Sequence, residues 1–135
     1  MKVTRVHLLM LLLTLFTACN NDVVEVVDNN TVRLTKKIWT FESITGFDEF
    51  NNSLASTLFT GMTYEFKTNG SYEAVILGQP QGGSWEFNNS LTIITLNPGT
   101  TDAIEWTLVT LTDDELIITQ EDSKAINGKV TWTFR

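Results

Sequence analysis

Hydrophobic and polar residues alternate along residues 62–76, which read MTYEFKTNGSYEAVI. A period of two places successive side chains on opposite faces of a β-strand, so this pattern predicts strands with one core face and one solvent face. Between the two halves, Asn69 and Gly70 provide the positive-φ residues that a tight hairpin turn requires. The segment therefore predicts an antiparallel hairpin.

The same alternation recurs in short segments from residue 38 to the C-terminus. These segments begin near residues 38, 62, 71, 84, 91, 103, 115 and 129. Their close spacing predicts a meander in which each strand pairs with the one before it. Eight strands can close into a barrel without exposed edges. We predict an all-β, eight-stranded antiparallel up-and-down barrel, with a two-sheet sandwich as the alternative.

Residues 47–60 interrupt the strand pattern after the first predicted strand. Their apolar residues follow spacings of three and four, which is typical of one face of a helix, and Asp48 is placed to cap its start. These apolar residues are Phe47, Phe50, Leu54 and Leu58. The segment is otherwise rich in Asn, Ser and Thr, so a helix here needs an apolar surface to pack on. We expect a short helix that lies across one end of the barrel as a plug or lid.

Two polar segments are predicted to be exposed loops. Residues 78–83 read GQPQGG, a composition typical of loops. Residues 120–129 connect the last two predicted strands and contain Asn127-Gly128, a typical turn pair. Both segments are candidates for docking on another protein.

The first 18 residues have the composition of an export signal. Lys2 and Arg5 precede an apolar run over residues 6–16, and Thr17-Ala18 follows it. A charged start, a short apolar run and small residues before a cut are typical of a signal peptide. The run is too short to span a bilayer. We predict that residues 1–18 are a signal peptide.

Cys19 is the only cysteine in the chain and follows this signal directly. An unpaired cysteine is unusual in an exported protein. Residues 15–19, LFTAC, resemble the lipobox of bacterial lipoproteins, although Phe16 departs from the usual aliphatic residue. The resemblance implies that Cys19 is acylated and anchors the protein to a membrane of the bacterial cell envelope, with the outer membrane as the expected one. Ordinary secretion with a free thiol is the alternative.

The residues after the anchor are polar, with Val23, Val24, Val26 and Val27 embedded among them. We predict a lipidated tether over residues 19–33, with a short added strand as the alternative. The compact barrel domain is then expected to cover residues 34–135.

Removal of the signal peptide makes the protein more acidic. It leaves seven of the nine cations against 16 acidic residues, a net charge of −9. Binding to a phosphate backbone needs a basic patch. We therefore expect no nucleic-acid partner and no electrostatic attraction to anionic lipid.

The mature domain would lack the residues of many common catalytic and metal sites. His7, the only histidine, leaves with the signal, and Cys19 is expected to be acylated. This removes Ser-His and Cys-His pairs and the usual zinc sites. The strand carboxylates alternate outward and are interpreted as solvated, and residues 113–115 lack the glycine of a calcium loop. We expect no enzymatic activity, no cofactor and no metal site.

Ten aromatic residues fall on the predicted inward face of the strands. Such rings bury on the order of 150–250 Å² each, so they can fill a core or line a cavity for an apolar ligand. Eight of them are candidates for a ligand-binding cavity: Trp39, Phe41, Tyr64, Phe66, Tyr72, Trp85, Trp106 and Trp132. The other two are Phe87 and Phe134.

Four motifs, taken in order, resemble the lipocalin-like domain of small bacterial lipoproteins. They are LTKKIW at residues 34–39, FKTNG at 66–70, GSWEF at 83–87 and LTDDEL at 111–116. The resemblance implies an eight-stranded barrel that holds a small hydrophobic molecule. It also implies that Trp39 plugs the closed end of the barrel and that a late Arg packs over it; Arg135 is the only late Arg, and Lys37 stands where lipocalins have Gly.

Two functions remain open from the sequence. The first is a membrane-anchored protein that binds a small hydrophobic ligand in the barrel. The alternative is a non-enzymatic interaction module, an accessory or inhibitor protein of the cell envelope with a filled barrel core. A fold that serves many functions does not decide between them.

Overall fold

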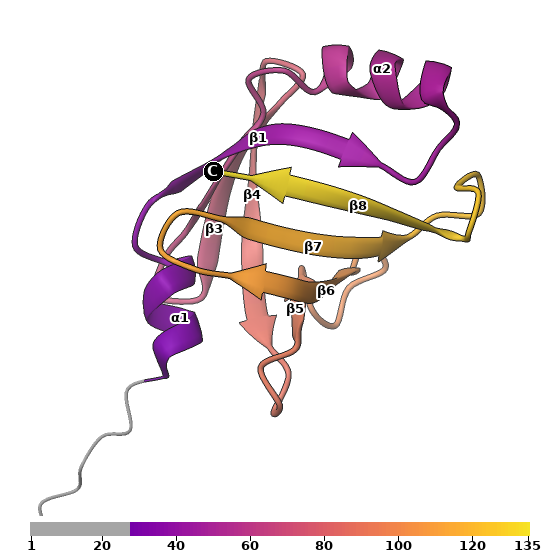
Figure 1. Cartoon of the computed structure of the whole chain (residues 1–135). Coiled ribbons are helices and arrows are strands. Elements are labelled where there is room, and N and C mark those ends of the chain that lie inside the picture. Colours follow the sequence, from indigo (N-terminus) through magenta and orange to yellow (C-terminus); the bar gives the residue numbers. More distant parts are fainter. Residues whose placement is uncertain (1–27) are drawn as a thin grey trace, which may run out of the picture.

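Eight antiparallel strands close into a barrel in the computed structural model, which describes residues 28–135 (Figure 1). Each strand pairs with the next along the chain, and β8 pairs with β1. The strands are β1 (Ile38–Thr45), β2 (Thr63–Phe66), β3 (Ser71–Ile76), β4 (Gln79–Phe87), β5 (Ile93–Leu96), β6 (Ile104–Leu111), β7 (Leu116–Glu121) and β8 (Lys129–Phe134). The predicted all-β, up-and-down barrel is confirmed.

The hairpin of β2 and β3 forms on the turn that the sequence predicts. Gly70 has a φ of 82°, and the Asn69 side chain accepts a hydrogen bond from the Ser71 backbone N–H at 3.0 Å. This turn sets a register in which Phe66 faces Tyr72 across the two strands. Both rings are buried, so the alternation correctly identifies the core face.

The prediction of a loop over residues 78–83 is wrong, because the chain turns at Leu77 and Gly78 and then continues as a strand. Leu77 and Gly78 both have positive φ, 52° and 75°, and form a two-residue turn of the type that matches the twist of a hairpin. Strand β4 starts immediately afterwards at Gln79, which pairs with Ile76 of β3. The first residues of β4 are exposed, which removes the apolar alternation that would have predicted a strand.

Pro80 fits within β4 because its nitrogen faces away from β3. The Trp85 backbone N–H donates to the Gly70 carbonyl at 2.8 Å, so the nitrogen of Trp85 faces the β3 side of β4. Successive backbone nitrogens of a strand face opposite edges, so the nitrogen of Pro80, five residues earlier, faces the β5 side. On that side, β5 pairs only with residues 85–87 of β4, so Pro80 has no strand neighbour. No ladder hydrogen bond is lost at Pro80, and the proline blunts a short unpaired edge.

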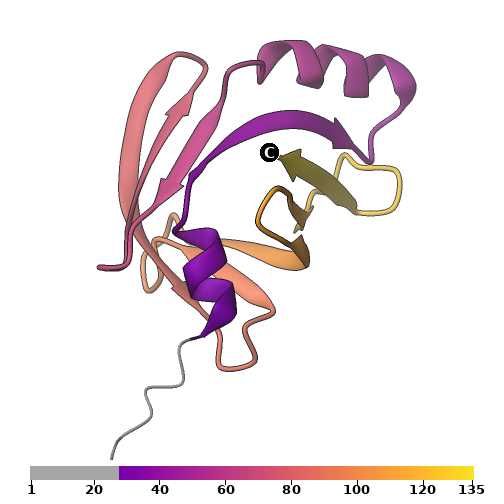
Figure 2. The same cartoon turned by 60° about the vertical axis from the view of Figure 1, so that its left-hand side comes forward.

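The predicted helix after β1 is confirmed as α2 (Glu49–Leu58), capped by Asp48, which accepts a hydrogen bond from the Asn51 backbone N–H at 3.0 Å. Figures 1 and 2 both show α2 lying alongside β1. Its orientation differs from the prediction. Phe50 is 75% exposed, whereas Ala55 of α2 and the flanking Phe47 and Phe59 pack against the core.

A second helix, α1 (Asn29–Leu34), occupies the end of the segment predicted to be tether. Asp28 caps it by accepting hydrogen bonds from the backbone N–H groups of Asn30 and Thr31 at 2.9 and 3.1 Å. Leu34 at its end is fully buried, so the folded domain begins before residue 34. The predicted signal peptide, Cys19 and the first part of the tether lie outside the described residues.

Burial and hydrogen bonds at Asp28 shift its pKa in opposite directions. Partial burial raises the pKa, while hydrogen bonds from the Thr31 hydroxyl and from the two backbone N–H groups lower it, and the net result is a pKa below the ordinary value. The carboxylate is therefore held in its charged form at the start of α1, where an anion interacts favourably with the exposed N–H groups.

Candidate functional site

The end of the barrel next to α1 is closed by packed side chains. Trp39 is fully buried and donates its indole N–H to the Leu34 carbonyl at 2.9 Å. A hydrogen bond from Asn30 to the Leu91 carbonyl holds α1 over this end. Just after the helix, Lys36 forms an ion pair with Asp113 at 2.8 Å. Trp39 thus plugs the closed end.

Lys37, rather than Arg135, covers the plugging tryptophan. The Lys37 ammonium lies 5.1 Å from the centre of the Trp39 ring, a cation–π arrangement. The Arg135 guanidinium instead contacts Glu42 at 2.6 Å and Glu115 at 3.0 Å. The role that the lipocalin resemblance implies for a late Arg is therefore not filled by Arg135.

The opposite end of the barrel is a mouth formed by the α2 segment and the loop at residues 122–128. Gly46, where the chain leaves β1, has a φ of 122°, and a side chain there would approach the Lys129 carbonyl to 2.4 Å. The Gly46 carbonyl also accepts a hydrogen bond from the Ile126 backbone N–H at 2.8 Å. This close approach requires glycine and ties the two segments of the mouth together.

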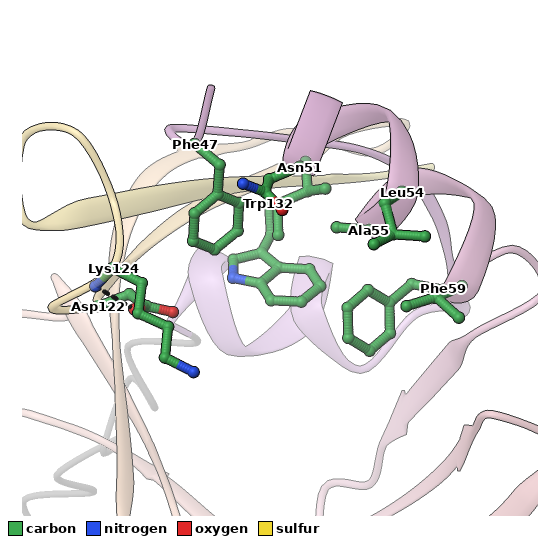
Figure 3. Close-up of a pocket in the computed structure, with 10 residues that line it drawn as sticks. Phe47, Asn51, Leu54, Ala55, Phe59, Asp122, Lys124 and Trp132 are labelled. Carbon is green, nitrogen blue, oxygen red and sulfur yellow. Dashed lines mark hydrogen bonds between the residues drawn. The ribbon is translucent and has the colours of Figure 1, made fainter. Parts of the chain in front are cut away.

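A groove of about 370 Å³ lies between α2, Trp132 of β8 and the loop at residues 122–128 (Figure 3). Its apolar floor and walls come from Phe47, Phe59 and Trp132, and two charged residues, Asp122 and Lys124, lie at one side. The complete lining is Ile44, Phe47, Asn51, Leu54, Ala55, Leu58, Phe59, Asp122, Lys124 and Trp132. The groove is thus mostly apolar, with a polar edge.

A second cavity of about 130 Å³ lies deeper in the mouth. It is lined by Phe59, Met62, Tyr64, Ile76, Ile104, Trp106, Gln120, Trp132 and Phe134. Phe59 and Trp132 line both spaces, and their rings meet edge to face with centres 5.0 Å apart. These two rings form the partition between the groove and the inner cavity.

Trp132 carries the one buried side-chain donor that finds no hydrogen-bond acceptor among residues 28–135, its indole nitrogen. Burying such a donor without an acceptor costs about 1–3 kcal/mol. Figure 3 shows the indole between Phe47 and Phe59, with its nitrogen on the side of Phe47 and the Asp122 loop. An unsatisfied donor at the wall of a cavity is a feature that a ligand can use.

Most of the eight aromatic candidates are core rather than cavity. Trp39, Phe41, Phe66, Tyr72 and Trp85 are buried and line neither space. Tyr64 and Trp106 line the inner cavity, and Trp132 lines both spaces. Burial, together with the neighbouring Tyr72, raises the pKa of Tyr64 and so favours its neutral phenol. Whether Tyr64, Trp106 and Trp132 bind a ligand stays a prediction.

Sequence reasoning missed several residues of the mouth. Phe59 is not one of the spaced apolar residues that predicted α2. The alternation pattern places Met62, Ile76 and Ile104 on the core face of their strands and does not indicate a cavity beside them. The spacing of Ala55 and Phe59, four residues apart on one helix face, is the signal that could have identified the packing side of α2. Gln120 carried no signal in a single sequence.

The acidic turn at residues 112–115 is used for ion pairs. Asp113 contacts Lys36 at 2.8 Å and Arg33 at 3.8 Å. The hydrogen bond from Lys36 and its positive charge, with a smaller effect of Arg33, lower the pKa of Asp113. Within residues 28–135, no three or more His, Cys, Asp or Glu residues cluster as a metal site would require.

Among the described residues, none of the helices has the length and hydrophobicity needed to cross a bilayer. This finding concerns only α1, α2 and the rest of residues 28–135. Attachment to a membrane through Cys19 is therefore a separate matter and stays a prediction.

Comparison with solved structures finds a similar fold. The chain superposes on the crystal structure of a DUF4847 family protein from Bacteroides vulgatus ATCC 8482, with a TM-score of 0.52 and 12% sequence identity, covering 75% of this chain and 92% of that protein. At this identity, the likeness shows a shared barrel fold. The sequence matches no known family profile and no curated protein.

Proposed function

We propose that this protein is a lipid-anchored, non-enzymatic binding protein of the bacterial cell envelope, similar to lipocalin-like lipoproteins, which holds a small apolar molecule at the mouth of its barrel. The observation that supports binding is the pair of adjoining spaces, about 370 and 130 Å³, that share Phe59 and Trp132 as their partition. Concave, largely apolar spaces with a few polar groups are the usual form of small-molecule sites.

The proposed site lies at the mouth rather than deep in the barrel. The interior is filled, because Trp39, Phe66 and Phe134 are almost fully buried along with Leu34, Ile94, Leu96, Leu116, Ile118 and Val130. A ligand is therefore expected to occupy the groove and to reach the inner cavity only when the Phe59 ring moves. Phe59 directly follows α2 and ends the helix, so motion of α2 would carry this ring.

The test is a fluorescence titration of residues 20–135 with Nile red, an apolar dye whose emission reports its surroundings. All eight strands and their pairings lie within residues 28–135, so this fragment retains the whole barrel. We expect saturable one-to-one binding and displacement by small apolar molecules. A cooperatively melting protein that binds no dye would overturn the proposed binding function.

Phe59→Ala sharpens this test, since it removes the partition between the two spaces. We expect tighter binding of the dye, because the larger joined space accommodates more of it. Phe50→Ala is the matched control: Phe50 lies on the same segment, is 75% exposed and lines neither space. Equal effects of the two changes would place the dye outside the mouth.

Anchoring is tested separately through Cys19. We expect Cys19→Ser to abolish incorporation of labelled palmitate and to move the protein from the membrane fraction to the soluble fraction. This expectation is supported by the lipobox-like residues 15–19 and by the membrane affinity of two or more acyl chains. Retention of the variant in washed membranes would contradict the anchor.

An interaction module of the cell envelope is the second candidate function. It is favoured by the filled core and by apolar side chains exposed beside the mouth, notably Phe50 at 75% and Ile126 at 70%. Exposed apolar side chains that form a contiguous patch often mark interaction sites. A folded protein that binds no apolar molecule would leave this candidate as the function to test with envelope extracts.

A further inference from the structure

We infer that the ligand carries a carbonyl-type hydrogen-bond acceptor at one end of an apolar body, and that the indole N–H of Trp132 selects for it. This inference rests on the proposed binding function and adds the polarity of the ligand. It starts from the buried indole nitrogen of Trp132, which has no acceptor among residues 28–135 although the Trp132 ring lines the groove.

Tryptophans at the closed end show what a purely structural indole looks like here. Trp39 donates to the Leu34 carbonyl at 2.9 Å, and Trp85 donates to the Lys67 carbonyl at 3.0 Å. Buried polar groups normally find such a partner. The Trp132 indole nitrogen is buried without such a partner, and Trp132 lines both spaces of the mouth.

Nearby polar groups of the protein do not take the place of an acceptor. The Asp122 carboxylate accepts a hydrogen bond from the Lys124 backbone N–H at 2.8 Å, which holds it within its own turn. Asn51, on the other wall of the groove, donates its side-chain N–H to Asp48 at 2.6 Å. A ligand oxygen would therefore supply a bond that the free protein lacks.

The polar edge of the groove offers two donors, on Trp132 and Lys124, and one acceptor, on Asp122. Lys124 and Asp122 both line this edge. The indole N–H and the ammonium are both donors only. Because the nitrogen is covered, a ligand reaches it by displacing the partly exposed Phe47 and the exposed Lys124 at this edge.

Three probes of equal chain length separate the contributions: octanoate, octanamide and octane. Octanoate and octanamide share a carbonyl oxygen, and octane has none. In competition with Nile red, we expect octanoate and octanamide to bind more tightly than octane to the unmodified barrel. One hydrogen bond to a buried donor corresponds to a difference on the order of three- to tenfold in affinity.

Trp132→Phe removes the N–H and keeps an aromatic ring, so it should abolish this preference while octane binding is little changed. Trp85→Phe is the matched control, because it makes the same change at an indole that already has a partner and lines neither space. In that variant the preference for a carbonyl should persist.

A second measurement does not depend on a variant that folds. In a ¹⁵N–¹H spectrum of the unmodified barrel, the four tryptophans give four indole N–H signals. Octanamide should shift the Trp132 signal in the direction of a stronger hydrogen bond, and octane should not.

The possible outcomes are distinct. Dye binding with equal affinity for all three probes, or a carbonyl preference that survives Trp132→Phe, overturns the role of the indole and leaves the binding function standing. A preference for octanoate alone would assign the selection to Lys124 and would also overturn it. No dye binding overturns both proposals.

Discussion

The two ends of the barrel use the same residue type in opposite ways. At the closed end, the Trp39 indole is fully buried and hydrogen-bonded to the Leu34 carbonyl, under a helix that is capped by Asp28 and ion-paired through Arg33. At the mouth, Trp132 is half-buried, its N–H lacks an acceptor, and two cavities meet at its ring. The Trp39 indole is satisfied within the fold, whereas the unsatisfied Trp132 indole supports the proposed site at the mouth.

The helices at the two ends of the barrel also differ in how far they are buried. The six-residue α1 buries Leu34 completely, and the ten-residue α2 buries none of its residues. A short helix gains most of its stability from tertiary packing, so α2 is held mainly by Phe47, Ala55 and Phe59 and by its cap. The mouth is therefore packed less tightly than the closed end, as the proposed binding of a ligand there would require.

The largest expected effect comes from equal truncations at the two ends. Trp39→Ala should lower the free energy of unfolding by about 3–5 kcal/mol, because it opens a cavity and leaves the Leu34 carbonyl unpaired. Trp132→Ala should cost less, about 1–3 kcal/mol, since the ring is half-exposed. Urea denaturation followed by circular dichroism measures both. Equal losses would show that the mouth is packed as tightly as the closed end.

A smaller effect is expected from the cap of α1. Asp28→Ala should lower stability by about 1 kcal/mol, and Asp28→Asn, which can still accept the same bonds, should lower it less. The pKa of Asp28 is lower in the folded protein than its ordinary value. Its charge therefore adds to the free energy of unfolding above the unfolded pKa of about 3.9, and this contribution is lost as pH falls through the folded pKa.

Urea midpoints of the wild type and Asp28→Ala, compared at neutral pH and at acid pH, test this cap. The gap between the two proteins should narrow in acid. A gap that does not depend on pH would show that the carboxylate acts only as a hydrogen-bond acceptor and that its charge contributes nothing.

The smallest expected effect is a gain in stability at the mouth. Leu77 has a φ of 52° and is 60% exposed, and the left-handed conformation costs a residue with a Cβ about 1–2 kcal/mol, less for Asn. Leu77→Asn should therefore raise stability by up to about 1 kcal/mol. Leu77→Ala, which keeps the strained conformation, is the control. A loss with Asn would mean that the Leu77 side chain makes contacts that matter.

Local patterns in the sequence were enough to predict much of the fold. The alternation of apolar residues identified β1 and the hairpin of β2 and β3, and Asp48 marked the start of α2. These features depend on neighbours within a few residues, namely strand period, turn residues and capping. The start of β4 was missed because its outer end is exposed, so that the alternation on which a strand prediction depends is absent there.

What the sequence by itself determined was therefore the number of strands, their order and the core face of the strands that carry aromatic residues. Only the tertiary structure decided which face of α2 packs, that residues 29–34 fold as a helix, and that Trp132 rather than Trp39 or Trp85 lies at a cavity. The physical reason is that these features depend on contacts between residues far apart in the chain, such as Asn30 with Leu91 at the closed end of the barrel and Phe59 with Trp132 at the mouth.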